Sequence, residues 1–328
     1  MHMQKRFPSD KMDIRGQHTA PVYLGNKISR FQIVGGSRLK PSMAIKALGL
    51  TNPLFEDIQC GKDIGRVRLV TGDFNYNKGD PTKTIRITFA ETGMGMASSD
   101  IIMRELVYAA DAMPVVQIRC GTAGGMNSKN MSEPVMRLGD IVIAENNIGS
   151  SSTIFQAMGY FPKVIPDRLS KKELDAFLKA WYDLGGRITP DGRFLEMANQ
   201  ATLTFALEQA AKHLGYKYYK GNSFSKDSLY GEGAEELMLS LRENNGVLAS
   251  EMEQLVNAFL MNLIKARYKV EVYSSMVLAV IGAVPGAGFP DKSDKKQMNL
   301  QEETEEKALR IAALAMKVFD NIYSHIIG

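Results

Sequence analysis

The sequence predicts an α/β protein built around one mixed β-sheet. Short β-branched runs alternate with helical patterns, several runs are followed by glycine, and the composition is that of an average globular protein. The chain has 328 residues, of which 45% are hydrophobic and 23% charged. It is therefore long enough to bury a large core without disulfide bonds, and its composition excludes a disordered or fibrous protein.

Five runs have the character of central strands, because they are short, rich in β-branched residues and bounded by turn residues. In chain order they cover residues 31–34, 84–90, 115–120, 140–144 and 276–281. Four longer segments carry apolar residues at the spacing of one buried helix face. These segments span residues 98–113, 201–214, 251–266 and 301–326.

Residues 150–200 differ from the rest of the chain. Prolines punctuate the region, a short charged helix starts at Ser170, and Gly185-Gly186 interrupts it. We predict a surface insertion there.

Net charge, cysteine content and hydropathy limit the partners and the cellular compartment that we expect for the protein. The net charge of +4, from 40 basic and 36 acidic residues, is too small and dispersed to predict nucleic-acid binding. Only Cys60 and Cys120 are present, which favours a reducing compartment. The most apolar stretch, residues 274–289, is interrupted by glycine and proline and is shorter than the ~20 residues of a membrane span. The N-terminus lacks the apolar segment of a signal peptide. We expect a cytoplasmic protein without a membrane partner.

The most informative motif runs from Glu91 to Leu106. It predicts a strand, a Gly93-Met94-Gly95 turn and a helix that begins near Ser98. Such a turn presents backbone N–H groups at the positive end of a helix, which suits an anion or a sugar. Taken alone, the turn is more simply explained as a tight strand-to-helix connection with an N-capping serine.

The spacing beyond the turn adds weight to the functional interpretation. Gly-Met-Gly, two residues, Ser, two residues, Ile, three residues and Glu-Leu resembles the signature of the nucleoside phosphorylase family, which includes uridine phosphorylase and the hexameric purine nucleoside phosphorylases. The resemblance extends from about His18 to the C-terminal helix. It implies a single domain over residues 1–328, apart from the insertion, with a twisted, partly barrel-like sheet flanked by helices. It also implies at least a homodimer with shared active sites.

A second motif runs from Ile118 to Gly125. It predicts a strand that delivers Arg119 to its C-terminal end, followed by a glycine turn. Most arginines pair at the surface, but burying one unpaired in an apolar strand is costly, and a guanidinium beside exposed amides makes a dianion site. By resemblance, Arg119 binds phosphate, Thr122 contacts phosphate and ribose, and Ala123 and Gly124 lie at the base. Related nucleosidases have asparagine in place of Arg119, so this residue favours phosphorolysis.

A third motif, Ser250-Glu251-Met252-Glu253, is predicted at a helix start, where the helix dipole by itself favours acidic residues. The resemblance implies that Glu253 accepts hydrogen bonds from the ribose 2′- and 3′-hydroxyls and that Met252 packs on the sugar. Arg119 and Glu253 are therefore the predicted catalytic residues.

The resemblance places further residues at phosphate and ribose. Gly36 would give phosphate a backbone donor, and Arg68 would reach the phosphate of a neighbouring subunit. His18 has the spacing of the histidine that reaches a neighbour's ribose 5′-hydroxyl, although a lone histidine in a loop is usually just exposed. Lys40 stands where the family has a phosphate-binding arginine, and Arg38 comes two residues earlier. Which of these two meets phosphate is left open.

The base pocket departs from the family pattern. The glutamine and arginine with which uridine phosphorylases bind uracil are missing, and residues 282–286 lack the aspartate of purine enzymes. Tyr230 is predicted to stack on the base and Glu232 to bind an N–H edge. The sequence therefore leaves base preference undecided.

Together the resemblances imply reversible phosphorolysis of a nucleoside, uridine first, to free base and ribose 1-phosphate. Inorganic phosphate is the expected co-substrate. We expect no cofactor and no metal, because the four histidines lack ligand spacing. Three alternatives stay open: a purine nucleoside phosphorylase, a nucleosidase that uses water, and a non-catalytic nucleoside-binding or regulatory protein on the same scaffold.

Overall fold

The computed structural model describes residues 28–36, 39–56, 59–60, 63–64, 68–127, 136–158, 170–226, 235–284 and 293–327. Most of its strands belong to one mixed sheet. Along the sheet the order is β2 (Thr51–Glu56), β5 (Leu69–Asn75), β6 (Thr84–Glu91), β1 (Phe31–Gly35), β7 (Val115–Met126), β12 (Val247–Glu251), β11 (Tyr219–Ser225), β8 (Ile141–Gly149), β10 (Leu195–Ala198) and β9 (Gly186–Ile188). A separate small ribbon joins β3 (Gln59–Cys60) to β4 (Asp63–Ile64).

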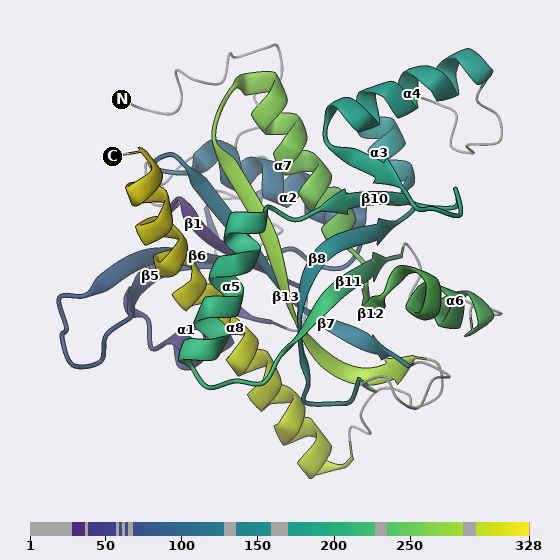
Figure 1. The fold of residues 1–328 in the computed structure, drawn as a ribbon. Coiled ribbons are helices and arrows are strands. Elements are labelled where there is room, and N and C mark those ends of the chain that lie inside the picture. The colour runs from purple at the N-terminus through teal and green to yellow at the C-terminus, as the bar shows by residue number, and fades with distance from the viewer. Residues whose placement is uncertain are drawn as a thin grey trace.

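A long strand, β13 (Val272–Val284), closes part of this sheet into a barrel. It runs parallel to β7 and antiparallel to β8, so that β7, β12, β11, β8 and β13 form a closed ring (Figure 1). The strand registers shift beside Ser223 and Gly282, and such bulges bend strands for closure. The predicted mixed, partly barrel-like sheet is confirmed.

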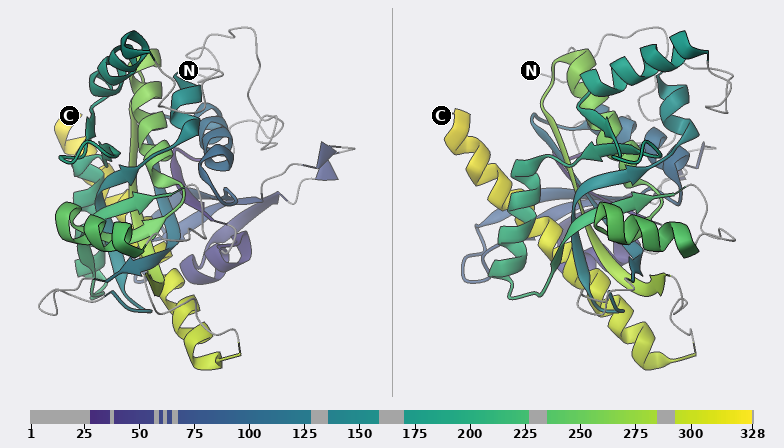
Figure 2. Two further views of the ribbon diagram at one scale, coloured as in Figure 1. Left: turned by 90° about the vertical axis from the view of Figure 1, so that its right-hand side faces the viewer. Right: turned by 45° about the vertical axis from the view of Figure 1, so that its right-hand side comes forward.

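Helices cover the sheet in two groups (Figures 1 and 2). α1 (Pro41–Leu48), α5 (Ala201–His213) and α8 (Lys295–Ile327) share one hydrophobic cluster with the sheet. α2 (Met96–Ala109) and α7 (Gln254–Tyr268) share another, to which α3 (Ser152–Ala157) and α4 (Lys171–Asp183) contribute. α6 (Glu235–Asn245) packs on the barrel beside β12. None of the helices described here combines the length and hydropathy needed to cross a lipid bilayer.

The five predicted strands and four predicted helices are confirmed, with shifted ends. One difference lies in β7, where residues 121–125 are predicted to form a turn but continue the strand to Met126. Both β12 and β13 pair with this stretch, so tertiary pairing overrides the weak strand preference of glycine. At Gly125 a Cβ atom would lie 2.5 Å from the Cβ of Met136, which explains why glycine is needed there.

The segment of residues 150–200 is joined to the core. The predicted helix at Ser170 is α4, and a capping box with Glu173 begins it. Phe177 and Trp181 of α4 are buried, and Trp181 stacks on Phe259 of α7 with ring centroids 5.9 Å apart. β10 extends the main sheet beside β8. That the segment is an insertion relative to the family stays a prediction.

Candidate functional site

A glycine turn joins β6 to α2 at the end of the sheet. Gly93 and Gly95 have φ angles of +74° and +90°, a region that favours glycine. The backbone N–H and the hydroxyl of Thr92 both donate to the carbonyl oxygen of Gly35, at 2.7 and 3.0 Å. The turn is therefore tied to the end of β1, with the N-terminus of α2 directly behind it.

The helix start differs from the prediction. α2 begins at Met96, its N-cap is Gly95, and Ser98 lies inside the first turn. The Ser98 hydroxyl donates to the Thr92 carbonyl oxygen at 2.6 Å. Ser98 therefore braces the glycine turn from within the helix and is not the N-cap.

Arg119 occupies a buried position in β7. The strand continues beyond it, contrary to the prediction, but Arg119 is level with the C-terminal ends of its neighbours: it pairs in register with Val34, and Gly35 pairs with Glu91. These strands are parallel, and ligands of α/β sheets bind at such carboxyl ends. The Arg119 side chain is only 3% exposed, which excludes a surface ion pair.

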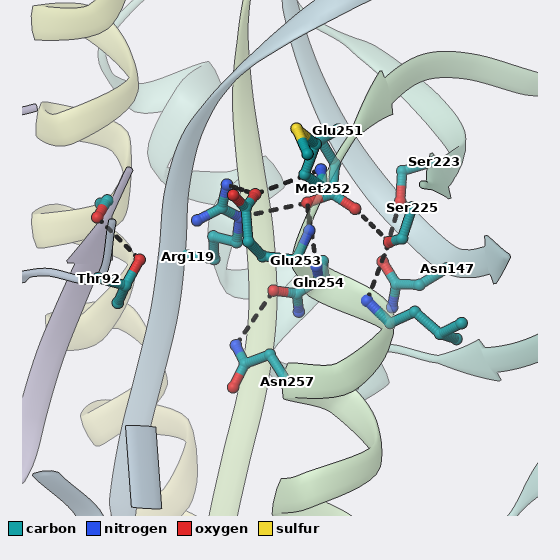
Figure 3. A network of polar contacts seen from close by, with 12 residues as sticks. Thr92, Arg119, Asn147, Ser223, Ser225, Glu251, Met252, Glu253, Gln254 and Asn257 are labelled. Atoms are coloured by element: carbon teal, nitrogen blue, oxygen red, sulfur yellow. Dashed lines mark hydrogen bonds and ion pairs between the residues drawn. The ribbon is translucent and has the colours of Figure 1, made fainter. Parts of the chain in front are cut away.

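The Arg119 guanidinium contacts two carboxylates. Its Nε donates to Oε2 of Glu251 at 3.3 Å, and its Nη2 donates to Oε2 of Glu253 (Figure 3). Its Nη1 is buried and has no hydrogen-bond partner within the described part of the chain. The buried guanidinium is thus neutralised, and one of its N–H-bearing nitrogens is left for a ligand.

Glu253 links the three predicted motifs. It is the N-cap residue of α7, and its side chain is 4% exposed. Its Oε1 accepts a hydrogen bond from the backbone N–H of Gly95 at 2.9 Å, while its Oε2 faces Arg119. Residues more than a hundred positions apart in the sequence therefore meet at one point.

Glu251 is the group that the sequence analysis missed. The motif Ser250-Glu251-Met252-Glu253 is predicted to start a helix, but Glu251 ends β12 and α7 begins only at Gln254. Its carboxylate accepts hydrogen bonds from the hydroxyl of Ser225, from the backbone N–H groups of Glu253 (2.7 Å) and Gln254 (2.9 Å), and from Arg119. Burial raises the pKa of Glu251, the charge of Glu253 adds to the rise, and Arg119 opposes it. The signal that could have identified Glu251 is an acidic residue that ends a strand close to the N-cap of the next helix.

Other predicted residues gather around this cluster. A Cβ built on Gly36 would lie 3.8 Å from the carbonyl oxygen of Gly93, which places Gly36 beside the glycine turn. Thr122 and Ala123 follow Arg119 along β7, and Gly124 pairs with Ser250 just before the acidic motif. Met252, which the sequence analysis predicts to pack on the sugar, lies between Glu251 and Glu253 in the chain and is half-buried.

The remaining predicted residues are either exposed or lie outside the described part of the chain. Lys40, the N-cap of α1, is exposed. Arg68 is also exposed, and its carbonyl oxygen accepts the Glu91 N–H at 2.9 Å, beside the end of β6. The residues that lie outside the described part of the chain are His18, Arg38, Tyr230 and Glu232.

A buried amide network supports α7 from behind. Gln254 Nε2 donates to Oδ1 of Asn199 at 3.0 Å, and Asn257 Nδ2 donates to Oε1 of Gln254 at 3.1 Å and to the hydroxyl of Ser274 at 3.0 Å. Hydrogen-bonded polar groups in a core fix the position of the elements that carry them. The network holds the N-terminus of α7, and with it Glu253, against β13.

Comparison with known proteins fits this geometry. A family model described as the phosphorylase superfamily matches residues 32–318. The chain belongs to the phosphorylase superfamily. This match spans the glycine turn, Arg119 and the acidic motif, so all three lie within the part of the chain that the superfamily shares. No individual curated protein sequence matched the chain.

Solved structures share the fold of this superfamily member. A uridine phosphorylase from Vibrio fischeri ES114, complexed with 6-hydroxy-1-naphthoic acid, has a TM-score of 0.57 and 18% identity, covering 88% of this chain and 91% of that one. A purine nucleoside phosphorylase from Toxoplasma gondii, in complex with immucillin-H, has a TM-score of 0.54 and 18% identity, with 88% and 91% covered. At this identity the likeness shows a shared fold.

Proposed function

We propose that the protein catalyses reversible phosphorolysis of a nucleoside, with uridine as the first expected substrate, to free base and ribose 1-phosphate. The observation that carries the proposal is the meeting of Arg119 and Glu253 beside the glycine turn. A buried guanidinium suits a phosphate dianion, and a carboxylate suits the hydroxyls of a sugar. Superfamily membership supports the same chemistry.

Phosphate is assigned to the Arg119 side of the cluster. Arg119 would supply its charge, and Gly36 and Thr122 would supply further donors beside it. Lys40 or Arg38 would add charge from the loop after β1. Arg68 is exposed at the edge of the site, which suits donation to a neighbouring subunit, so the proposal includes at least a homodimer with shared active sites.

The sugar is assigned to Glu253 and Met252, with His18 reaching it from a neighbour. In the proposed reaction the glycosidic bond breaks first and leaves an oxocarbenium-like sugar. Phosphate beneath C1′ stabilises this cation and then attacks it, so that ribose 1-phosphate forms and the base leaves. The protein contributes orientation and placed charges, and no covalent enzyme intermediate is needed.

The base is assigned to Tyr230, Glu232 and the backbone at Ala123 and Gly124. A purine nucleoside is the second candidate, because solved structures with this fold include a purine nucleoside phosphorylase as well as uridine phosphorylases. The low cysteine content supports a cytoplasmic, reducing environment as part of the proposal.

The test is an assay of uridine, thymidine, inosine and adenosine, each with and without inorganic phosphate, with free base as the readout. We expect base release from at least one nucleoside only when phosphate is present. Release without phosphate would indicate a nucleosidase. Nucleoside binding without any release would indicate a non-catalytic binding protein.

A further inference from the structure

The two carboxylates on Arg119 differ in how firmly they are held. Glu251 contacts Nε, which lies next to the side-chain stem, whereas Glu253 contacts the terminal Nη2. The second terminal nitrogen, Nη1, has no hydrogen-bond partner among the residues described. An anion that presents two oxygens end-on to the guanidinium, as tetrahedral phosphate can, would therefore meet Nη1 and compete with Glu253 for Nη2.

Glu251 is fixed in place. Its side chain is 0% exposed and bridges three elements, since its hydrogen bonds come from Ser225 in β11, from Arg119 in β7 and from the N-cap and first residue of α7. If Glu251 moved, two buried backbone N–H groups and a buried hydroxyl would lose their acceptor. The cost of leaving buried donors unpaired keeps Glu251 where it is.

Glu253 is held more weakly. Apart from Arg119, its carboxylate accepts from the backbone N–H groups of Gly95 (2.9 Å) and Met252 (3.2 Å), which belong to residues that are only half-buried. While Glu253 faces Nη2, its negative charge opposes an anion at the same nitrogen. The same contact occupies an oxygen that the sugar hydroxyls would need.

We propose that Glu251 is a positioning residue that holds Arg119 by Nε, and that Glu253 is an exchangeable partner, which leaves Nη2 when phosphate binds and then faces the sugar. This inference rests on the proposed function. It makes phosphate and nucleoside binding favour each other, because either ligand removes the Arg119–Glu253 contact that opposes the other. Such coupling is reciprocal.

Two variants of Glu251 separate position from charge. Glu251→Asp keeps the charge but shortens the side chain by one methylene, whereas Glu251→Gln keeps the reach and removes the charge. Calorimetric titration with inorganic sulfate, which avoids turnover, measures anion affinity. We expect Asp to raise the sulfate Kd about tenfold, as for loss of a charge-assisted hydrogen bond. Glu251→Gln should bind sulfate at least as tightly as the wild type does. Tighter sulfate binding by Glu251→Asp than by Glu251→Gln would overturn the positioning role.

Ser225→Ala provides a milder test that leaves Arg119 and both carboxylates intact. It removes one donor to Glu251 and should raise the sulfate Kd in the same direction as Asp, by a smaller factor. In the phosphorolysis assay, Ser225→Ala and Glu251→Asp should each raise the KM for phosphate and leave the nucleoside KM nearly unchanged. A purely structural role would lower the amount of folded enzyme and leave both KM values unchanged, and that result would contradict the inference.

Glu253→Gln tests the exchange. We expect the variant to bind sulfate several-fold tighter than the wild type, because the opposing charge is gone. Titrations of uridine and of inosine, each with and without sulfate, measure the coupling. In the wild type, sulfate should tighten nucleoside binding at least about fivefold, and in Glu253→Gln this gain should vanish. Unchanged or weaker sulfate binding in the variant would overturn the exchange.

The controls separate this inference from the proposed function. A wild-type protein that binds neither sulfate nor any nucleoside contradicts the proposed function itself. A wild-type protein that binds both, with affinities unchanged in Glu251→Asp and Glu253→Gln, leaves the proposed function standing and overturns the coupling.

Discussion

Arg119 shows how a charge is accommodated inside an apolar strand. Its neighbours along β7 are fully buried, and the guanidinium is neutralised by Glu251 and Glu253, which come from the end of β12 and the start of α7. Removing one partner of such a buried cluster leaves the others uncompensated. The cluster therefore contributes to folding as well as to the proposed chemistry.

Replacing Arg119 should separate these contributions. Arg119→Ala is expected to lower phosphorolysis by at least about 100-fold, because the main electrostatic stabiliser is lost. Arg119→Lys keeps the charge without the two-pronged geometry and should retain intermediate activity. Initial rates at saturating nucleoside, with circular dichroism as the check on folding, measure both. Near-normal activity of a folded alanine variant would remove Arg119 from the site.

Glu253 should distinguish sugars. Glu253→Gln is expected to reduce kcat/KM for uridine by about 10- to 100-fold, since a charge-assisted hydrogen bond to the hydroxyls is lost. For 2′-deoxyuridine, which lacks one of the two hydroxyls, the loss should be smaller. The comparison uses the same enzyme preparation for both substrates. An equal loss on both would contradict the assigned contact.

Glu251 should make stability depend on pH. Burial raises its pKa above the ordinary value of 4.5 for a glutamate, so the native state holds this proton more tightly than the unfolded chain. The free energy of unfolding then falls as pH rises from about 4.5 through the pKa of the folded state. Glu251→Gln lacks this component and should gain stability relative to the wild type across that window. Urea unfolding at a series of pH values measures the difference, and a constant difference would contradict the shift.

At the scale of elements, the sequence predicted those strands and helices that a local residue pattern determines. The β-branched runs and apolar stripes predict the central strands and the helices that cover them. The sequence did not predict features that depend on distant partners. Residues 121–126 form a strand because β13 and β12 pair with them, and Glu251 ends a strand because β11 and β7 flank β12. The motifs of the candidate site were found, but the contact between Arg119 and the two acids depends on the fold.

The glycine turn is the element on which the site's geometry depends. Gly95 has a φ of +90° and donates its N–H to Glu253, and a Cβ there would meet nothing within 4 Å. Gly95→Ala should therefore act through backbone strain alone, costing about 1–2 kcal/mol of stability, and should also reduce activity by moving the N–H.

Gly49→Ala is the matched control for the turn. Gly49 caps α1 at a φ of +60°, and a Cβ there also meets nothing within 4 Å. Gly49→Ala should lower the free energy of unfolding, measured in urea, by about as much as Gly95→Ala does. It should leave activity unchanged. Equal activity losses in the two variants would show that the Gly95 effect is global destabilisation.

At the scale of the whole molecule, the site lies where the barrel meets the outer part of the sheet. β7 belongs to both, because it pairs with β1 on one side and with β12 and β13 on the other. The parallel strands β1, β6 and β7 bring Gly36, the glycine turn and Arg119 to one level. The barrel supplies Glu251 and the start of α7. The groups proposed to bind phosphate and those proposed to bind the sugar thus come from different parts of the fold.

The segment of residues 150–200 should prove integral to this molecule. Trp181 is fully buried between Phe177 and Phe259, and its indole N–H donates to the carbonyl oxygen of Arg187 at 2.8 Å. Trp181→Ala should destabilise the protein by about 3–5 kcal/mol, the usual cost of emptying a large aromatic site. The neighbouring Tyr182 is 51% exposed, so Tyr182→Ala should change stability by less than about 0.5 kcal/mol. Urea unfolding of both variants measures the contrast. Similar small losses would mean that the segment folds apart from α7 and is a surface addition.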